Sequence, residues 1–169
     1  MSLIFLCFST IILKAFKIIV EKHNNIKLIL IGYGPEKKNI IKMTKNLKIY
    51  NKIIIINKTY NPYPYMKKSM LLILTSVYEG FPNVLVESLT IGTPVISTNM
   101  NAGASEILIN GKGGELIKLG DYKNLSKKII SFITSSRELR KKTRFGQSKL
   151  HRFSAITHSK IYSKIFKKI

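Results

Sequence analysis

Short runs of apolar residues recur along the chain, and polar stretches with helical spacing separate them. Short continuous apolar runs are typical of strands that are buried on both faces of a parallel sheet. The runs expected to form strands are 26–31, 53–56, 70–74 and 94–97, with 115–117 as an edge strand. The pattern therefore predicts an α/β fold, in which helices flank a parallel sheet on both faces.

The segments between these runs carry their apolar residues on one side, as amphipathic helices do. Helices are expected at 14–22, 36–46, within 61–66, from 82 or 83 onward, and at 121–132, 136–150 and 154–168. The small residues of 99–105 predict a loop, after which a short helix begins at 106–109. The last part of the chain, 121–169, is therefore expected to be helical.

The first thirteen residues, MSLIFLCFSTIIL, are apolar but do not read as a targeting segment. No positive residues precede them and no small-residue cleavage site follows them. The run is also shorter than the ~20 residues that a membrane-spanning helix needs. We interpret it as a buried element, with 1–10 an atypical or truncated start of the domain.

Length and charge limit the functions to consider. At 169 residues the chain fits a single domain, 1–169, with a hydrophobic core of its own. Lys and Arg number 29 against 8 Asp and Glu, a net charge of +21 that attracts nucleic acids and anionic lipids. Nearly all these cations are lysines, whereas base readout favours arginine. Specific nucleic-acid binding is therefore not expected, and contact with an anionic membrane surface stays open.

Cysteine and histidine offer neither a disulfide nor a metal site. Cys7 is a single cysteine, and His23, His151 and His158 lack the spacing of metal ligands. The sequence therefore predicts no metal site.

Two carboxylates, Glu79 and Glu87, lie in the stretch YEGFPNVLVESLTIGTPVI at 78–96. Pro82 suits a first helical turn, so a helix should begin at Pro82 or Asn83, with both acids near its positive end. The free N–H groups of that end would suit a phosphate. On spacing alone, a functional acidic pair is about as well supported as its alternative, in which Glu87 only complements the helix dipole beside a solvated Glu79.

Four loops follow the expected strands, at 32–35, 57–61, 75–82 and 98–105. Because ligands of open α/β sheets bind at the carboxyl ends of the strands, these loops should form one rim that includes both glutamates. This placement favours the functional interpretation. Stacking platforms for nucleic acid, core packing, or contact with a base in the ligand crevice would each explain four tyrosines: Tyr33, Tyr60, Tyr63 and Tyr65.

At the motifs E-G-F-P-N-x-L-x-E-S, from Glu79, and G-T-P-V-I-S, from Gly92, the chain resembles a known family. It is similar to the C-terminal, donor-binding domain of the retaining GT-B glycosyltransferases called glycosyltransferase group 1. The resemblance runs over 11–168, and the NPYPYM segment at 61–66 is similar to members that build bacterial surface polysaccharides such as lipopolysaccharide or capsule. It implies a Rossmann-like domain, the C-terminal half of a GT-B fold.

The resemblance also implies a nucleotide-sugar site. Glu87 would accept hydrogen bonds from ribose hydroxyls, and Glu79, as the catalytic residue, would hold hydroxyls of the transferred sugar. The turn and the helix start would cap the sugar or the diphosphate through Gly80, Phe81, Pro82 and Asn83. The residues that would approach the base are Gly32, Gly34, Asn57 and Lys58. The family needs no metal; the expected donor is a UDP-sugar, and the expected acceptor is a glycan or a lipid-linked glycan.

Some departures from the family pattern bear on activity. Complete members carry a Gly-Arg strand end and a nearby Lys before the first long helix, whereas 1–10 contain neither. Their loss removes charge that would stabilise a leaving diphosphate. Asn57 stands where glycine is usual, a swap that a positive φ tolerates. The acceptor-binding N-terminal domain is expected to be missing, or on another chain, which would leave an apolar helix side partly exposed: Ile161, Ile165, Phe166 and Ile169.

Three hypotheses follow from the sequence. The chain is the donor domain of a retaining hexosyl- or N-acetylhexosaminyltransferase, or a truncated or split-gene product that binds nucleotide sugar without turnover, or a basic protein at a membrane surface. The expected location is cytoplasmic, peripheral at the inner face of the plasma membrane.

Overall fold

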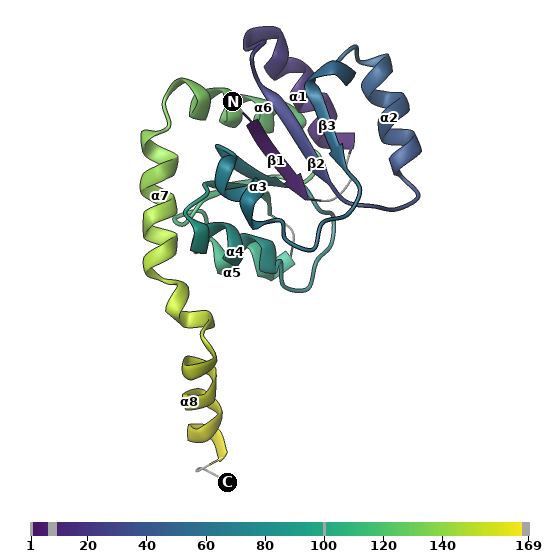
Figure 1. Cartoon of the computed structure of the whole chain (residues 1–169). Coiled ribbons are helices and arrows are strands. Elements are labelled where there is room, and N and C mark those ends of the chain that lie inside the picture. The colour runs from purple at the N-terminus through teal and green to yellow at the C-terminus, as the bar shows by residue number, and fades with distance from the viewer. Residues whose placement is uncertain (1, 7–9, 100, 167–169) are drawn as a thin grey trace.

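The computed structural model describes residues 2–6, 10–99 and 101–166. Within these residues six parallel strands form one sheet in the order β3-β2-β1-β4-β5-β6 (Figure 1). The strands are β1 (Ser2–Leu6), β2 (Lys27–Ile31), β3 (Ile53–Ile56), β4 (Leu71–Leu74), β5 (Val95–Thr98) and β6 (Glu115–Ile117). The expected parallel α/β sheet is confirmed.

Helices connect the strands and cover both faces of the sheet. They are α1 (Thr10–Lys22), α2 (Lys37–Asn46), α3 (Tyr63–Lys68), α4 (Asn83–Ile91), α5 (Asn101–Ile107), α6 (Tyr122–Thr134), α7 (Arg137–Ser148) and α8 (Ala155–Phe166), with 3-10 turns η1 (Tyr50–Lys52) and η2 (Leu150–Phe153). Apolar residues of α1, α2 and α6 form the core on one face, and those of α3, α4 and α5 form the core on the other. Helices on both faces explain why the strands read as continuous apolar runs.

The strand β1 is the element that the apolar pattern did not assign. Leu3 and Ile4 are fully buried and belong to the cores on opposite faces of the sheet. β1 pairs with β2 and with β4, so it occupies the middle of the sheet. Burial of this run is confirmed at Leu3 and Ile4, whereas residues 1 and 7–9 lie outside the described residues. The helix α1 begins earlier than predicted, at Thr10.

The loop predicted at 99–105 and the separate helix at 106–109 are wrong. One helix, α5, begins at Asn101 and ends at Ile107. The small residues that suggested a loop instead let this helix approach its neighbours closely. A Cβ atom at Gly103 would lie 2.8 Å from the carbonyl oxygen of Gly80, a distance that real Cβ atoms do not adopt.

The helical end of the chain is confirmed, with α6, α7 and α8 close to their predicted ranges. α8 extends away from the sheet (Figure 1). Ile165 is 51% exposed and Phe166 is 71% exposed, as expected for an apolar side without a cover. The side chains of Ile161 and Ile169 lie outside the part that the structure describes. No helix among the described residues is both long and apolar enough to cross a membrane.

Candidate functional site

The strand order creates a topological switch point between β1 and β4. The helix that follows β1, α1, packs on one face of the sheet, whereas α4, which follows β4, packs on the other. In open α/β sheets, ligands bind outside the carboxyl ends of the strands at such a point. The loop that carries Glu79 starts at this place, directly after β4.

The helix α4 begins where the sequence predicted it. Pro82 is its N-cap with φ at −77°, and its carbonyl accepts the N–H of Leu85 at 2.9 Å. The N–H of Asn83 donates to the carbonyl of Phe81 at 2.9 Å and is thereby used. Among the described residues, the N–H groups of Gly80 and Phe81 have no hydrogen-bond partner. These two N–H groups are therefore available to an anion at the positive end of the helix.

Glu79 is half-buried and is oriented by a residue that the sequence did not single out. The Ser76 hydroxyl donates a hydrogen bond to Oε1 of Glu79 at 2.5 Å. The carbonyl of Ser76 in turn accepts the hydroxyl of Thr98, the last residue of β5, at 2.8 Å. The neighbouring strand therefore fixes the loop that carries Glu79.

Glu87 is half-buried on α4 and keeps its carboxylate unpaired. Within the described residues, no hydrogen bond or ion pair reaches this carboxylate. The chain carries 29 lysines and arginines, so cations are not scarce. A partly buried carboxylate without a partner loses hydration and gains no hydrogen bond from the protein in return. Such a group is a candidate for binding a ligand.

A second buried polar group at this edge is also unpaired. The hydroxyl of Thr75, directly after β4, is 1% exposed and has no hydrogen-bond partner among the described residues. Unpaired buried hydroxyls are uncommon in folded proteins and need an explanation. Among the described residues, the half-buried carboxylate of Glu87 and the buried hydroxyl of Thr75 are therefore both without a partner.

The residues predicted to approach a base lie on two neighbouring strands. The N–H of Gly32, after β2, donates to the carbonyl of Ile56 in β3 at 3.0 Å. Gly34 has φ at +144°, which strains any residue with a side chain. Asn57 and Lys58 are exposed after β3. This group and the Glu79 group share one edge of the sheet, with the end of β1 between them.

The ammonium group of Lys58 lies 5.1 Å from the ring centroid of Tyr60. Core packing, one of the explanations for the tyrosines, is wrong because all four are exposed: Tyr33 77%, Tyr60 94%, Tyr63 47% and Tyr65 38%.

The family's arginine and lysine before the first long helix are missing from residues 1–10 of the sequence. Residues 7–9 of this stretch lie outside the described residues. Within those residues, no cluster of three or more His, Cys, Asp or Glu side chains forms. The metal-independent chemistry stays a prediction.

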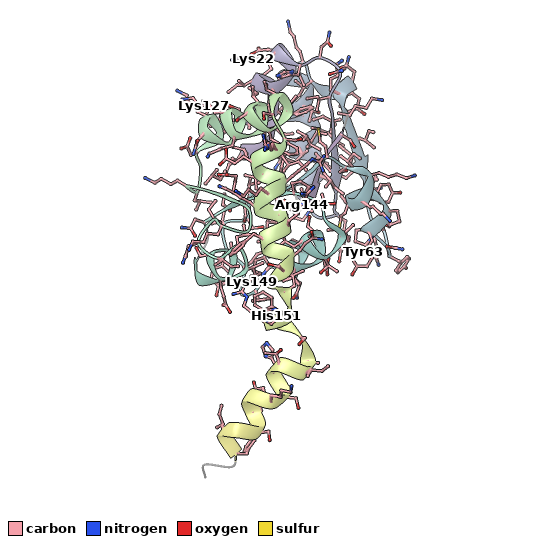
Figure 2. The ribbon with its side chains drawn as sticks, turned by 90° about the vertical axis from the view of Figure 1, so that its left-hand side faces the viewer. Lys22, Tyr63, Lys127, Arg144, Lys149 and His151 are labelled. Carbon is pink, nitrogen blue, oxygen red and sulfur yellow. The ribbon has the colours of Figure 1, made fainter. Side chains whose placement is uncertain are left out.

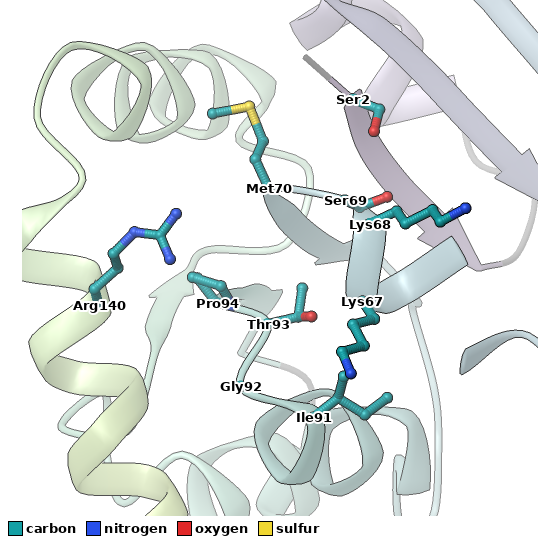
Figure 3. Close-up of a pocket in the computed structure, with 10 residues that line it drawn as sticks. All are labelled: Ser2, Lys67, Lys68, Ser69, Met70, Ile91, Gly92, Thr93, Pro94 and Arg140. Atoms are coloured by element: carbon teal, nitrogen blue, oxygen red, sulfur yellow. The ribbon is translucent and has the colours of Figure 1, made fainter. Parts of the chain in front are cut away.

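A hollow of about 360 Å³ lies at the opposite, amino edge of the sheet (Figure 3). Its lining combines Ser2 before β1, Met70 before β4 and Pro94 before β5 with the cations of Lys67, Lys68 and Arg140. In Figure 3 the lysines come from α3 and the arginine reaches in from α7. No residue of the predicted site lines this hollow, so the hollow is separate from the predicted nucleotide-sugar site.

The sequence matches a family model for glycosyl transferases group 1 over residues 10–149. The capsular polysaccharide biosynthesis glycosyltransferase CapM of Staphylococcus aureus is 32% identical over 124 residues, 72% of this chain and 32% of CapM. N-acetyl-alpha-D-glucosaminyl L-malate synthase of Bacillus anthracis is 32% identical over 123 residues, again 72% of this chain and 32% of that protein. The chain thus spans about a third of the length of these relatives.

Solved structures share the fold over nearly the whole chain. HepE of Anabaena, in complex with UDP, superposes with a TM-score of 0.88 at 19% identity, covering 99% of this chain and 49% of HepE. The C-terminal domain of LpcC, a group 1 family protein of Francisella tularensis, superposes with a TM-score of 0.74 at 20% identity, covering 88% of this chain and 83% of that one. The Rossmann-like domain expected as one half of a GT-B fold is confirmed.

Proposed function

Because the chain belongs to the glycosyl transferases group 1 family, we propose that it is the donor-binding part of an enzyme that transfers a sugar from a UDP-sugar. The structure of HepE with UDP-glucose supports this donor class. A Campylobacter jejuni relative, 32% identical over 101 residues, is named for transfer to a diphospho-undecaprenol glycan, which supports a lipid-linked or glycan acceptor. The acceptor half would come from another chain or another part of the protein.

The unpaired carboxylate of Glu87, on the helix that follows the switch-point loop, carries this proposal. We assign it to the ribose hydroxyls, since a carboxylate accepts two hydroxyl hydrogen bonds without an accompanying cation. The residues 79–82, named here the donor loop, would hold the rest of the donor. Glu79, oriented by Ser76, would bind hydroxyls of the transferred sugar. The free N–H groups of Gly80 and Phe81 would bind the diphosphate at the positive end of α4.

The proposed reaction proceeds with retention at the anomeric carbon. The bond from that carbon to the diphosphate oxygen breaks, and its electron pair stays on the diphosphate. The acceptor hydroxyl oxygen forms the new bond on the same face and gives its proton to the leaving diphosphate oxygen. Within this scheme the donor loop stabilises the charge that develops on the diphosphate. Contact with an anionic membrane at the inner face of the plasma membrane stays a prediction from the sequence.

Titration calorimetry of this chain with UDP and UDP-sugars tests the proposal. Glu87→Gln keeps the shape of the side chain but removes its charge, so we expect UDP to bind about 10- to 100-fold more weakly. Glu138→Gln is the matched control, because Glu138 is an exposed carboxylate on α7, 84% accessible and outside the donor loop. Absence of heat with every nucleotide sugar, or equal affinities for Glu87→Gln and the unmodified chain, would refute the proposal.

A further inference from the structure

The donor loop is held from two sides by segments that are distant in the sequence. On one side α5 places Gly103 against it, with room for no side chain beside the carbonyl of Gly80. On the other side, the ring of Phe81 meets the ring of Phe153 in η2, edge to face, with centroids 5.3 Å apart and planes at 68°. Such aromatic pairs stabilise a contact beyond the effect of the area that they bury.

Phe153 is itself fixed by the neighbouring Arg152. The guanidinium carbon of Arg152 lies 4.7 Å from the ring centroid of Phe153. Its Nη2 donates to the carbonyls of Glu106 and Ile107 at 3.3 and 3.4 Å, and its Nε donates to the carbonyl of Lys149 at 3.0 Å. Glu106 and Ile107 are the last two residues of α5. The guanidinium therefore ties η2 to the same helix that supports the other side of the donor loop.

These contacts form one network. The donor loop packs against α5, the carbonyls at the end of α5 bind Arg152, and Arg152 packs on Phe153, whose ring contacts Phe81 in the donor loop. We propose that Arg152 and Phe153 are positioning residues for the nucleotide sugar, an inference that rests on the proposed function. Phe81 carries one of the two free N–H groups, so fixing its ring also fixes the direction of that donor. A loop held in place before binding loses less conformational entropy when the diphosphate arrives.

The same network of contacts includes the first turn of α8. Thr157 in the first turn of α8 donates its hydroxyl to the carbonyl of His151 at 2.8 Å, and its N–H donates to the hydroxyl of Ser154 at 3.2 Å. In Figure 2, Arg144, Lys149 and His151 follow one another along α7 and η2, with α8 beyond them. The position of α8 is thereby linked to the donor loop through η2.

An ordinary packing role for Phe153 makes a different prediction. Phe153 is half-buried and packs against the core that contains Leu85 and Ala104. If packing were its only role, replacement would lower stability without a selective loss of nucleotide affinity. Phe81, by contrast, is 40% exposed, so the ring pair lies at the surface of the loop, where it can affect the ligand directly.

The first test compares UDP affinity, measured by calorimetry, in Phe153→Leu and Phe145→Leu. Phe145, on α7, is the matched control, since its ring lies 5.7 Å from the ammonium of Lys149 and meets no donor-loop ring among the described residues. We expect Phe153→Leu to weaken UDP binding about three- to tenfold and Phe145→Leu to leave it unchanged. Adding Phe81→Leu to Phe153→Leu should cause no further loss beyond that of Phe81→Leu alone, and Phe153→Tyr should restore affinity.

The second test replaces the guanidinium. Arg152→Lys keeps the charge but loses the planar fork that reaches two carbonyls and the ring, so we expect it to weaken UDP binding as Phe153→Leu does. Arg140→Gln is the control, because Arg140 lies 6.0 Å from the ring of Phe132, away from the donor loop.

Amide signals of Gly80 and Phe81 in NMR spectra of the free protein give a readout without ligand. They should shift or broaden in Phe153→Leu and in Arg152→Lys but not in either control. If the unmodified chain binds UDP and both variants bind it equally well, with unchanged amide signals, this inference is overturned while the proposed function stands. If the unmodified chain binds no nucleotide, the proposed function fails, and unchanged amide signals then overturn the positioning role as well.

Discussion

Two partly buried carboxylates of this chain have opposite surroundings. Glu115, on the edge strand β6, has a side chain that is 12% exposed and bonded to two ammonium groups, those of Lys142 and of Lys128 at 2.9 Å. Burial raises the pKa of Glu115, but the hydrogen bonds and charges of the two lysines outweigh it and hold that pKa below its ordinary value. Glu87, on α4, has no such partner among the described residues.

The difference separates a carboxylate that stabilises the fold from one that the fold leaves free. Among the described residues, three of the eight acidic side chains form ion pairs with lysines: Glu21, Glu115 and Glu138. Glu115 joins β6 to α6 and α7 through its two lysines, so its charge is used within the structure. The charge of Glu87 is not used there, and a ligand with hydroxyl donors would use it.

Charge reversal should produce the largest difference between the two glutamates. Glu115→Lys places three ammonium groups together in a partly buried site, so we expect the free energy of unfolding to fall by about 3 kcal/mol. Glu87→Lys breaks no pair, and its cost should stay below about 1 kcal/mol. Urea denaturation followed by circular dichroism measures both. Equal losses for the two variants would mean that Glu87 has a structural partner in solution, and the comparison would fail.

Acid should remove the contribution of the Glu115 carboxylate to the free energy of unfolding. Because the pKa of Glu115 is lower in the folded chain than its ordinary value of 4.5, its ion pairs stabilise the fold fully above that value. Their contribution is lost as the pH falls below 4.5 and through the lowered pKa. We expect Glu115→Gln to cost about 1–2 kcal/mol at pH 7, since Lys128 is partly exposed, and progressively less as the pH falls below 4.5 and through the lowered pKa.

The control for this titration is the unmodified chain. Urea midpoints of Glu115→Gln and of the unmodified chain, measured in parallel from pH 7 to pH 3, compare the two proteins directly. A difference between Glu115→Gln and the unmodified chain that persists undiminished at pH 3 would contradict the assigned ion pairs.

Local signals in the sequence predicted the parts of the fold that depend on local chemistry. Pro82 predicted the start of α4 because a fixed φ and a missing N–H suit that position, and the apolar runs predicted five of the strands. β1 was not assigned because its apolar residues continue into α1 with no glycine, proline or charge at their junction. α5 was taken for a loop because small residues signal turns in a sequence, although here they serve close packing.

The contacts that hold the loop of the candidate site in place could not be predicted, because they join segments that are far apart in the chain. Thr98 in β5 reaches Ser76, which follows the adjacent strand β4, and Phe153, which follows α7 in the chain, reaches Phe81. No spacing rule connects such residues, since each pair is set by the sheet order and by the helix packing. The roles of Glu79 and Glu87 themselves came from the resemblance to a family and stay predictions.

Thr75, which follows β4, and Thr98, which ends β5, allow a comparison of a buried hydroxyl without a hydrogen bond and one with a hydrogen bond. Both hydroxyls are buried, but that of Thr98 donates to the carbonyl of Ser76 at 2.8 Å, whereas that of Thr75 has no partner among the described residues. Thr98→Val should therefore lower the free energy of unfolding by about 1 kcal/mol, because it leaves a carbonyl unsatisfied. Thr75→Val removes only an unpaired hydroxyl, so stability should stay the same or rise by up to about 1 kcal/mol. Thermal and urea unfolding of the two variants, side by side, measure this difference. A decrease in the free energy of unfolding for Thr75→Val as large as that for Thr98→Val would show that the Thr75 hydroxyl is already hydrogen-bonded in the free protein.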